Sequence, residues 1–504
     1  MYSIENELVN QKNLLAEIAQ YVASDAQNQE LHQVEEEILR QIMNLGQFLV
    51  REVIARRGDG YVGDTFDDND VKRRYKGKRK TAYLSVFGEL KIERAYYWKA
   101  GAGGILPLDS QLNLPASKVS YFVQKLFQGR VTEGSYDEAL RVMAEFFGLP
   151  LNKRIQEKLT RQASALRDEF YQEKKPFEVG EEGEVIGVSA DGKGVRMVPT
   201  EKPEAESEAK ADESSGTRRG KGEKPGNRRM AVATADFTFD PESRTPEEMV
   251  KLLMRKIGGK ERKQDRARRR KRRELGEPPP RAALNVQVSA TMRGKEEALR
   301  ELAVRVKRRD PSGLKRIAVF LDGERALERG VVSAFRAAGI LGRVDMFVLD
   351  IIHASEYLWE AGSAIFGEAG GKRKRWAEEQ LLKLLRGGVG QVIGGLRRRQ
   401  SSGKLKPSQG RVLKKVSTYF ENHREMMRYD EALSKGYPIG TGLIEGACRS
   451  LVKDRMDISG AKWSRAGAEA VLRLRGIRKN GDWNDYWEKM ITKNHRQLYA
   501  DCQN

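Results

Sequence analysis

The sequence predicts an α/β protein whose mixed sheet region is preceded by helical and β-hairpin segments. Helical patterns at 294–309 and 325–339 alternate with strand-like runs in the second half of the chain, an order typical of a mixed α/β layer. Helical periodicity also dominates residues 4–56 and the stretch 360–435. At 504 residues, two to four domains are expected. The strand-like runs are 184–190, 229–239, 316–321 and 344–350.

The charge balance indicates a polyanionic partner. The formal net charge is +21, and Lys and Arg gain affinity for nucleic acid by releasing condensed counterions. No run reaches the ~18 apolar residues that span a bilayer, and the first residues lack a signal-peptide pattern, so we expect a cytoplasmic protein with no membrane partner. The two cysteines, Cys448 and Cys502, exclude a disulfide framework and a four-cysteine zinc site.

Residues 1–115 divide into two predicted regions. In 1–56, apolar residues recur along one helical stripe, which fits either a packing helix or a dimerisation element. In 57–115, a polar stretch at 57–75 is predicted to be loop. Residues 80–98 then alternate apolar and polar about Gly88, which predicts a β-hairpin. The polar positions Lys80, Lys91 and Arg94 allow a DNA-facing ribbon or a purely structural one.

Residues 116–178 are predicted to be helical. A helix at 136–147 ends at Gly148, and a basic helix follows after a short turn, as in a helix-turn-helix that binds DNA. A plain helical hairpin fits the same pattern. The basic residues of the second helix are Lys153, Arg154, Lys158 and Arg161.

Residues 183–359 are predicted to hold the first part of the sheet region. A short strand runs into Asp191, and residues 195–198 are predicted to be its returning strand. Charged, low-complexity inserts at 200–228 and 257–282 have little to bury and are expected to be flexible. The polybasic run at 262–273 has no assigned role.

Two aspartates follow apolar strands and precede a glycine, Asp191-Gly192 and Asp322-Gly323. A single Asp-Gly pair is most often an ordinary turn, but two such pairs at the ends of strands indicate a functional site. Mg²⁺ prefers carboxylate oxygens, and two such ions can assist phosphoryl transfer. Glycine lets backbone and phosphate approach closely.

Three further residues are candidates. Glu445 lies among small and apolar residues near a predicted helix start, where it needs a metal or a partner such as Arg449. Asp350 closes the strand 344–350 and fits a helix N-cap. His353 follows three residues later, and a zinc site is not expected because the other histidines lie in unrelated segments.

Four pieces of the chain resemble ISKra-type bacterial insertion-sequence transposases, which are related to the Mutator-like DDE transposases. The resemblance covers residues 183–487 well and the N-terminal third more loosely. The pieces are Ala190-Asp-Gly-Lys-Gly194, Leu321-Asp-Gly323, Asp350-Ile-Ile-His-Ala-Ser-Glu-Tyr-Leu-Trp359 and Gly440-Thr-Gly-Leu-Ile-Glu-Gly-Ala-Cys-Arg449, and the match continues through Lys453-Asp-Arg-Met-Asp-Ile-Ser-Gly-Ala-Lys-Trp463.

The resemblance implies an RNase H-like catalytic core with a DDE triad of Asp191, Asp322 and Glu445. It implies an all-helical insertion at 360–435 and a C-terminal core part at 436–487. The residues after these, 488–504, are predicted from their composition to be a polar tail. Asp350 and His353 match an Asp/Cys-x-x-His element, with His353 near the scissile phosphate.

The same resemblance implies a DNA transposase that cleaves and transfers strands with two Mg²⁺ ions, or Mn²⁺ in their place. A homodimer or larger oligomer on double-stranded DNA, both element ends and target, is expected in the bacterial cytoplasm near the nucleoid. The alternatives are an RNase H-like nuclease without strand transfer and a catalytically silent DNA-binding derivative. Trp463 either stacks on a base or packs in the core. The expected DNA contacts are Lys193, Arg449, Lys453, Arg455, Lys462 and Trp463.

Overall fold

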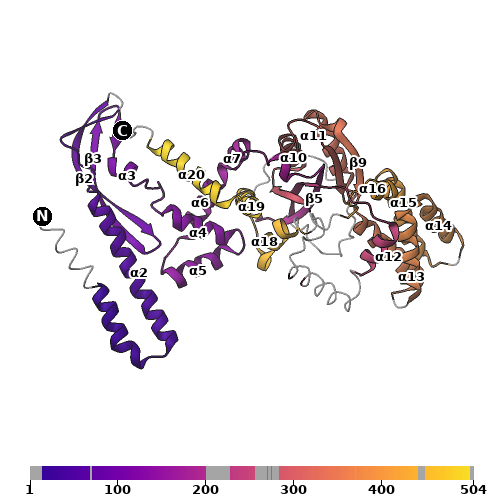
Figure 1. The fold of residues 1–504 in the computed structure, drawn as a ribbon, viewed down its shortest axis with the longest axis horizontal. Helices are drawn as coiled ribbons and strands as arrows, with labels where there is room; N and C mark the ends of the chain where they lie inside the picture. Colours follow the sequence, from indigo (N-terminus) through magenta and orange to yellow (C-terminus); the bar gives the residue numbers. More distant parts are fainter. Residues whose placement is uncertain are drawn as a thin grey trace. The chain divides into compact units, whose positions relative to one another are not determined.

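The chain forms two compact units, the first made of residues 1–172 and 481–504 and the second of residues 173–480. Both contain helices and one β-sheet, so the predicted α/β class is confirmed (Figure 1). No helix of the described residues is long and apolar enough to cross a membrane. The computed structural model describes residues 14–68, 71–199, 228–255, 270, 274, 283–368, 371–403, 405–440, 446 and 449–499.

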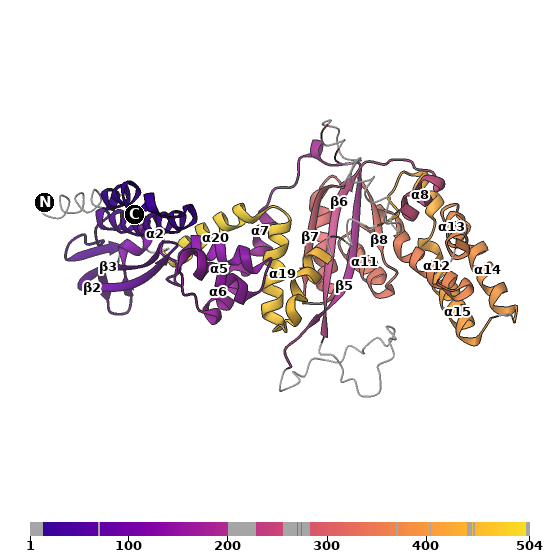
Figure 2. The same ribbon diagram turned by 90° about the horizontal axis from the view of Figure 1, so that it is seen from below.

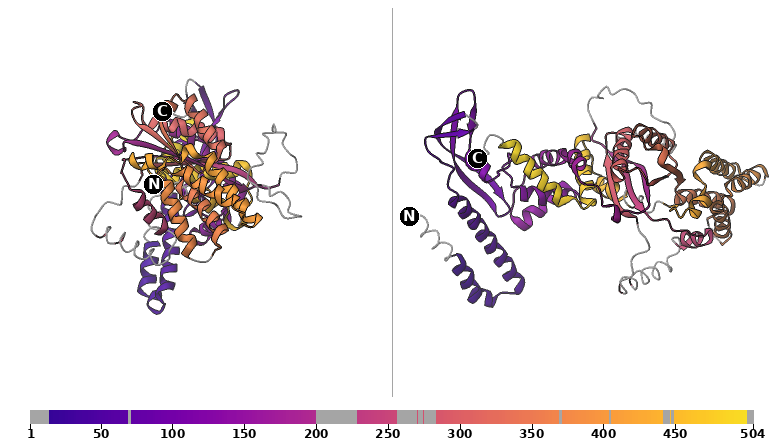
Figure 3. Two further views of the ribbon diagram at one scale, coloured as in Figure 1. Left: turned by 90° about the vertical axis from the view of Figure 1, so that its right-hand side faces the viewer. Right: turned by 45° about the horizontal axis from the view of Figure 1, so that its top comes forward.

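The first unit begins with a broken helical segment. Residues 14–23 are helical, a short 3₁₀ turn follows, and α2 spans Leu31–Arg56 (Figure 3). The glycine at 46 lets α2 approach Phe87, and the Gln47 amide donates to the Glu89 carbonyl at 3.1 Å. The dimerisation interpretation stays a prediction; α2 leaves five apolar side chains exposed: Leu31, Leu39, Ile42, Leu49 and Val53.

An antiparallel sheet follows in the order β1-β2-β3-β4. The predicted hairpin is confirmed, since Ser85 pairs with Gly88 across a two-residue turn. The predicted loop at 57–75 is wrong in part, because Phe66 and Tyr75 pack against Tyr97 and draw their segments into strands. The strands are β1 (Thr65–Asp68), β2 (Val71–Ser85), β3 (Gly88–Lys99) and β4 (Gly103–Ile105).

Helices complete the described part of this unit. Gly148, with φ 61°, ends α5, and the Asn152 side chain caps α6 by accepting from the Arg154 and Ile155 amides. The predicted polar tail at 488–504 is wrong for residues up to 498, which belong to α20, a helix that buries Tyr486 and Trp487. Residues 500–504 lie outside the described part of the chain. The helices are α3 (Pro107–Gln111), α4 (Tyr121–Val131), α5 (Tyr136–Phe147), α6 (Lys153–Ala165), α7 (Arg167–Glu173) and α20 (Trp483–Leu498).

The second unit is built on a five-stranded sheet in the order β7-β6-β5-β8-β9 (Figure 2). β5, β6 and β7 pair antiparallel, whereas β8 and β9 run parallel to β5. The prediction that residues 195–198 return is wrong: Val195 and Arg196 continue β5, and β6 is the returning strand. The strands are β5 (Val185–Arg196), β6 (Arg228–Phe239), β7 (Leu284–Thr291), β8 (Arg316–Leu321) and β9 (Val344–Leu349).

Helices surround this sheet, and the predicted helical character of 360–435 is confirmed. In Figure 2, α12 to α15 gather beyond β8. After this group the chain passes a π-helical turn at Arg449–Lys453 before its last helices in this unit. The helices are α8 (Pro246–Arg255), α10 (Lys295–Arg309), α11 (Arg325–Ala337), α12 (Ile351–Phe366), α13 (Gly371–Leu385), α14 (Val389–Ser401), α15 (Pro407–Asn422), α16 (Tyr429–Ser434), α18 (Asp454–Met456) and α19 (Arg465–Lys479).

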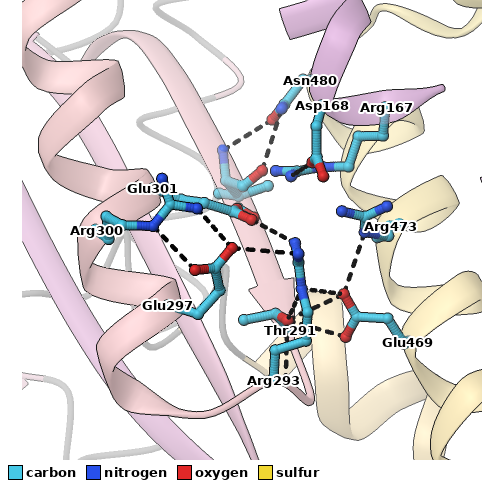
Figure 4. A network of polar contacts seen from close by, with 12 residues as sticks. Arg167, Asp168, Thr291, Arg293, Glu297, Arg300, Glu301, Glu469, Arg473 and Asn480 are labelled. Carbon is cyan, nitrogen blue, oxygen red and sulfur yellow. Dashed lines mark hydrogen bonds and ion pairs between the residues drawn. The ribbon is translucent and has the colours of Figure 1, made fainter. Parts of the chain in front are cut away.

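Polar contacts from α19 and the residue after it cover the edge strand β7 (Figure 4). The Asn480 side chain bonds both backbone groups of Val288, at 2.8 and 3.1 Å, as a neighbouring strand would. Glu469 accepts from the Met292 amide at 2.6 Å and from Arg473 Nε at 3.1 Å. These contacts satisfy backbone groups that an open edge would leave for other chains.

A buried ion cluster fastens α10 to the sheet. The Asp236 carboxylate on β6 lies 2.7 Å from Arg305 Nε and 3.3 Å from Arg309 Nε. Asp236 and Arg309 are almost fully buried. Asp236 pairs with Val188, three residues before Asp191, so the two aspartates point to opposite faces of the sheet.

Candidate active site

Three aspartates stand in one row across the parallel strands β5, β8 and β9. Ser189 pairs with Phe320. Continued by two residues, this register sets Asp191 beside Asp322. Leu321 pairs with Leu349, and the Asp350 amide donates to the Leu321 carbonyl at 2.8 Å, which continues the ladder. Neighbouring strands lie ~4.8 Å apart. Two carboxylates predicted from separate sequence segments are therefore adjacent.

Asp191 lies inside β5 rather than at its end, which differs from the prediction. The strand continues to Arg196, and it is the neighbouring β8 that stops at Leu321. The Asp191 side chain is 19% exposed, and its Oδ2 lies 2.9 Å from Lys193 Nζ, two residues on along the same face. Gly192 leaves room for Met230, whose Cε would lie 2.7 Å from an added Cβ.

Asp322 begins the turn that leaves β8. Its Oδ1 accepts the Glu324 amide at 3.0 Å, and no cation of the described residues forms an ion pair with it. Gly323 has φ +93°, a conformation that favours glycine. The carboxylate oxygens therefore remain able to bind a cation, while the turn fixes the backbone of Asp322.

Two side chains that the sequence did not indicate, one in α15 and one from the residue that follows it, hold this turn. The Tyr419 hydroxyl donates to the Asp322 carbonyl at 2.8 Å, and His423 Nε2 lies 2.7 Å from the Gly323 carbonyl. A Cβ at Gly323 would lie 2.5 Å from the Tyr419 hydroxyl oxygen, so only glycine allows this approach. Both residues come about a hundred positions later in the chain, and no local pattern connects them to Asp322.

The electrostatics around Tyr419 agree with this geometry. Burial raises the pKa of Tyr419, and the charges of Asp322 and Asp350 raise it further. Tyr357 stacks on the same ring, with centroids 3.9 Å apart. The Tyr419 hydroxyl therefore stays protonated as a donor to the Asp322 carbonyl. The Asp322 and Asp350 carboxylates lie close enough to raise its pKa.

Asp350 is engaged as a helix cap, as the N-cap prediction required. Its buried carboxylate accepts the Ile352 amide at 2.7 Å at the start of α12. The Tyr429 hydroxyl donates to the Leu349 carbonyl at 3.0 Å, which fixes the end of β9. His353 lies in the first turn of α12 with its side chain 42% exposed, and its Nδ1 is 3.3 Å from Glu356.

The structure revises two of the expected DNA contacts. Arg455 and Trp463 are buried at 1% and 7% exposure, and the Arg455 guanidinium lies over the Trp463 ring, 4.7 Å from its centroid. The indole donates to the Met456 carbonyl at 3.1 Å. Of the two interpretations of Trp463, core packing therefore holds, because an apolar neighbourhood and a backbone acceptor satisfy both parts of the ring. Lys453 and Lys462 are exposed.

Some predicted residues lie outside the described part of the chain. These are Glu445, the side chain of Arg449, nearly all of the insert at 200–228, and the insert at 257–282 except residues 270 and 274. On α6, Arg154, Lys158 and Arg161 are exposed at helical spacing, whereas Lys153 is paired with Asp137 at 2.8 Å.

The residues present fit part of a divalent-cation site. Carboxylate oxygens are the ligands that Mg²⁺ prefers, and Asp191 and Asp322 supply them from adjacent rigid strands. Within the described residues no group of three or more His, Cys, Asp or Glu side chains could hold a metal. The third expected ligand, Glu445, is not among those residues.

Removing the Tyr419 hydroxyl tests whether α15 positions Asp322. We expect Tyr419→Phe to weaken Mg²⁺ binding roughly three- to tenfold, the effect of losing about one hydrogen bond. The Mg²⁺ concentration that gives half-saturation, measured by titration calorimetry, should rise by the same factor. The control is Tyr437→Phe, which removes another buried hydroxyl, hydrogen-bonded to Asp345 at the far end of β9. Equal metal dependence in wild type and Tyr419→Phe would contradict the positioning role.

No protein-family model matches the chain, and no curated protein is significantly similar to it.

Proposed function

We propose that this protein is a DNA transposase that cleaves and joins DNA strands with divalent metal held by Asp191, Asp322 and Glu445. The observation that carries the proposal is the register of the parallel strands β5 and β8, which, continued two residues beyond the pair Ser189–Phe320, sets Asp191 beside Asp322. Like charges side by side repel each other, which favours a bound cation between them. Lys193 balances only part of this charge, from 2.9 Å.

The sheet supports an RNase H-like core. Such a core has three antiparallel strands followed by two that run parallel to the first, with the first strand central. The order β7-β6-β5-β8-β9, with β5 central, is consistent with that arrangement. Asp191 then lies on the central strand and Asp322 after the fourth strand in sequence. The helices α13 to α16 are consistent with an all-helical insertion between Asp322 and Glu445.

The proposed reaction has two steps of the same kind. Water first attacks a phosphodiester and releases a 3′-OH end, and that 3′-OH then attacks a phosphodiester of target DNA. Bound Mg²⁺, or Mn²⁺, would stabilise the attacking and leaving oxygens. The backbones of Asp191 and Asp322 fix the positions of the two carboxylates. Lys193 reaches a DNA phosphate, and His353 at the start of α12 contacts the scissile phosphate.

The first unit supports a DNA partner. The helices α5 and α6, joined by a turn at Gly148, fit a helix-turn-helix, with Arg154, Lys158 and Arg161 on one exposed face of α6. The net charge of +21 favours phosphate binding. A homodimer on DNA, in the cytoplasm, completes the proposal.

The test uses the full-length chain and a DNA fragment that carries this gene with its own flanking sequences. With Mg²⁺ and a target plasmid, we expect nicks that leave 3′-OH ends, followed by joined products, and neither in EDTA. Hydrolysis without joining would identify a nuclease instead. DNA binding without cleavage would identify a silent derivative, and joined products in EDTA would contradict metal-dependent chemistry.

A further inference from the structure

A β-bulge in the first unit brings two arginines to the same face of the β2–β3 hairpin. Arg74 pairs with Trp98, and Arg79 pairs with Arg94, but the register shifts between Tyr75 and Lys78. Arg74 and Arg79 are five residues apart, so a regular strand would point them to opposite faces. The extra residue in β2 reverses the alternation, and Gly77, with φ +97°, supplies the backbone for it.

The face so formed combines cations with aromatic rings. The Arg79 guanidinium lies over the Tyr96 ring, 3.4 Å from its centroid, and Tyr96 in turn lies over Gly104, where no side chain fits. Trp98 is 40% exposed. Stacking fixes the plane of a guanidinium while leaving its donors directed outward. We call this face the ribbon patch: Lys72, Arg74, Arg79, Tyr96 and Trp98.

The charges of the ribbon patch are not neutralised locally. Within the described residues, Lys72, Arg74 and Arg79 form no ion pair, and the one acidic residue across from them is Asp67, which pairs with Lys72 in the strand register. The opposite face differs, since Lys80 lies 3.5 Å from Glu93 and Lys78 lies 2.8 Å from Asp59. Arg94 lies opposite Arg79 in the register and so on the same face as the ribbon patch, but it is nearly buried and bonds Asp109 at 2.8 Å, so it is not available to DNA.

We infer that the ribbon patch is a second DNA-binding surface, separate from α6, in which Lys72, Arg74 and Arg79 contact phosphates and Trp98 stacks against a base or sugar. Unpaired cations on a twisted two-stranded ribbon complement the charge of a DNA backbone. An exposed Trp beside fixed guanidinium groups adds the aromatic contact that nucleic-acid surfaces use. The inference rests on the proposed function for its choice of DNA as the partner.

The experiment measures binding of the full-length protein to a short duplex from the gene's flank, by fluorescence anisotropy from about 50 to about 300 mM salt. We expect Arg74→Gln with Arg79→Gln to weaken binding about tenfold and to lower the salt slope by about two, one for each phosphate contact. Trp98→Ala should weaken binding about three- to tenfold. The matched control is Lys80→Gln with Lys91→Gln, which removes two charges from the opposite face and should change affinity less than about twofold.

Wild-type affinity and salt slope in the Arg74→Gln and Arg79→Gln variant would overturn the inference, as would an equal loss in the control. If the ribbon patch bound a protein instead of DNA, this variant would show the wild-type DNA affinity and salt slope. Cleavage by the wild type tests the proposed function separately. If wild type cleaves DNA and the patch variants bind normally, only the inference fails. If wild type does not cleave but patch variants lose binding, only the enzymatic proposal fails.

Discussion

Replacing Asp322 with asparagine is expected to lower DNA strand cleavage on the order of a thousandfold or more, because groups that act as one catalytic unit fail together. Asparagine keeps the size of the side chain and can still accept the Glu324 amide, which lies 3.0 Å from Asp322 Oδ1. The substitution therefore removes the negative charge and little else. Single-turnover cleavage of the flank fragment, with Mg²⁺ in excess, measures the effect.

Thermal unfolding shows whether the lost activity comes from a lost cation site. Without metal, Asp322→Asn should melt at the wild-type temperature or slightly above it, since it relieves repulsion with Asp191. Added Mg²⁺ should stabilise wild type and leave the variant unchanged, as ligand binding to the folded state requires. The control Asp345→Asn alters a carboxylate at the start of β9, paired with Lys435 at 2.9 Å, and should keep wild-type cleavage. Normal cleavage by Asp322→Asn would remove this residue from the site.

Local patterns predicted most of the helices and strands and the two aspartates, but not what surrounds those aspartates. An apolar run that ends in Asp-Gly predicted where Asp322 lies, and the strand pairing that sets Asp191 beside it depends on register across the sheet. Tyr419 and His423 reach the same turn from α15 and the residue that follows it, through contacts that only the folded chain creates. The α20 helix could have been predicted, since Tyr486, Trp487 and Met490 repeat at helical spacing.

Two carboxylates of the same sheet show what separates a candidate ligand from a structural charge. Asp322 follows β8 with no cation of the described residues paired to it, whereas Asp236 on β6 contacts both Arg305 and Arg309. Sequence alone presents each as an aspartate next to an apolar strand. The distinction depends on α10, whose arginines occupy one face of the sheet and leave the other face, with Asp191, for chemistry.

Replacing Asp236 with alanine is expected to destabilise the second unit by about 3–5 kcal/mol, because removal of one member of a buried ion cluster leaves uncompensated charge. Arg309 would keep the Asn285 carbonyl at 2.6 Å and Glu182, whose Oε1 lies 3.7 Å from its Nε, and Arg305 would keep the Thr234 hydroxyl at 3.0 Å. None of these contacts replaces the carboxylate that both guanidinium groups share. Denaturant unfolding of the full-length chain gives the change in free energy.

The control for Asp236→Ala is Glu242→Ala, which breaks an exposed ion pair with Arg244 at 3.2 Å and should cost less than about 1 kcal/mol. A variant that removes the whole cluster, Asp236→Leu with Arg305→Met, Arg309→Met and Glu182→Gln, should recover much of the lost stability, since apolar groups of similar volume often replace buried ion pairs without loss. Glu182→Gln is included because Glu182 is buried and pairs with Arg309. A loss below about 1 kcal/mol in Asp236→Ala would mean that water reaches the cluster. Asp236 would then have the same solvent access as the aspartates across the sheet, and burial could no longer explain why only Asp191 and Asp322 are candidates for metal binding.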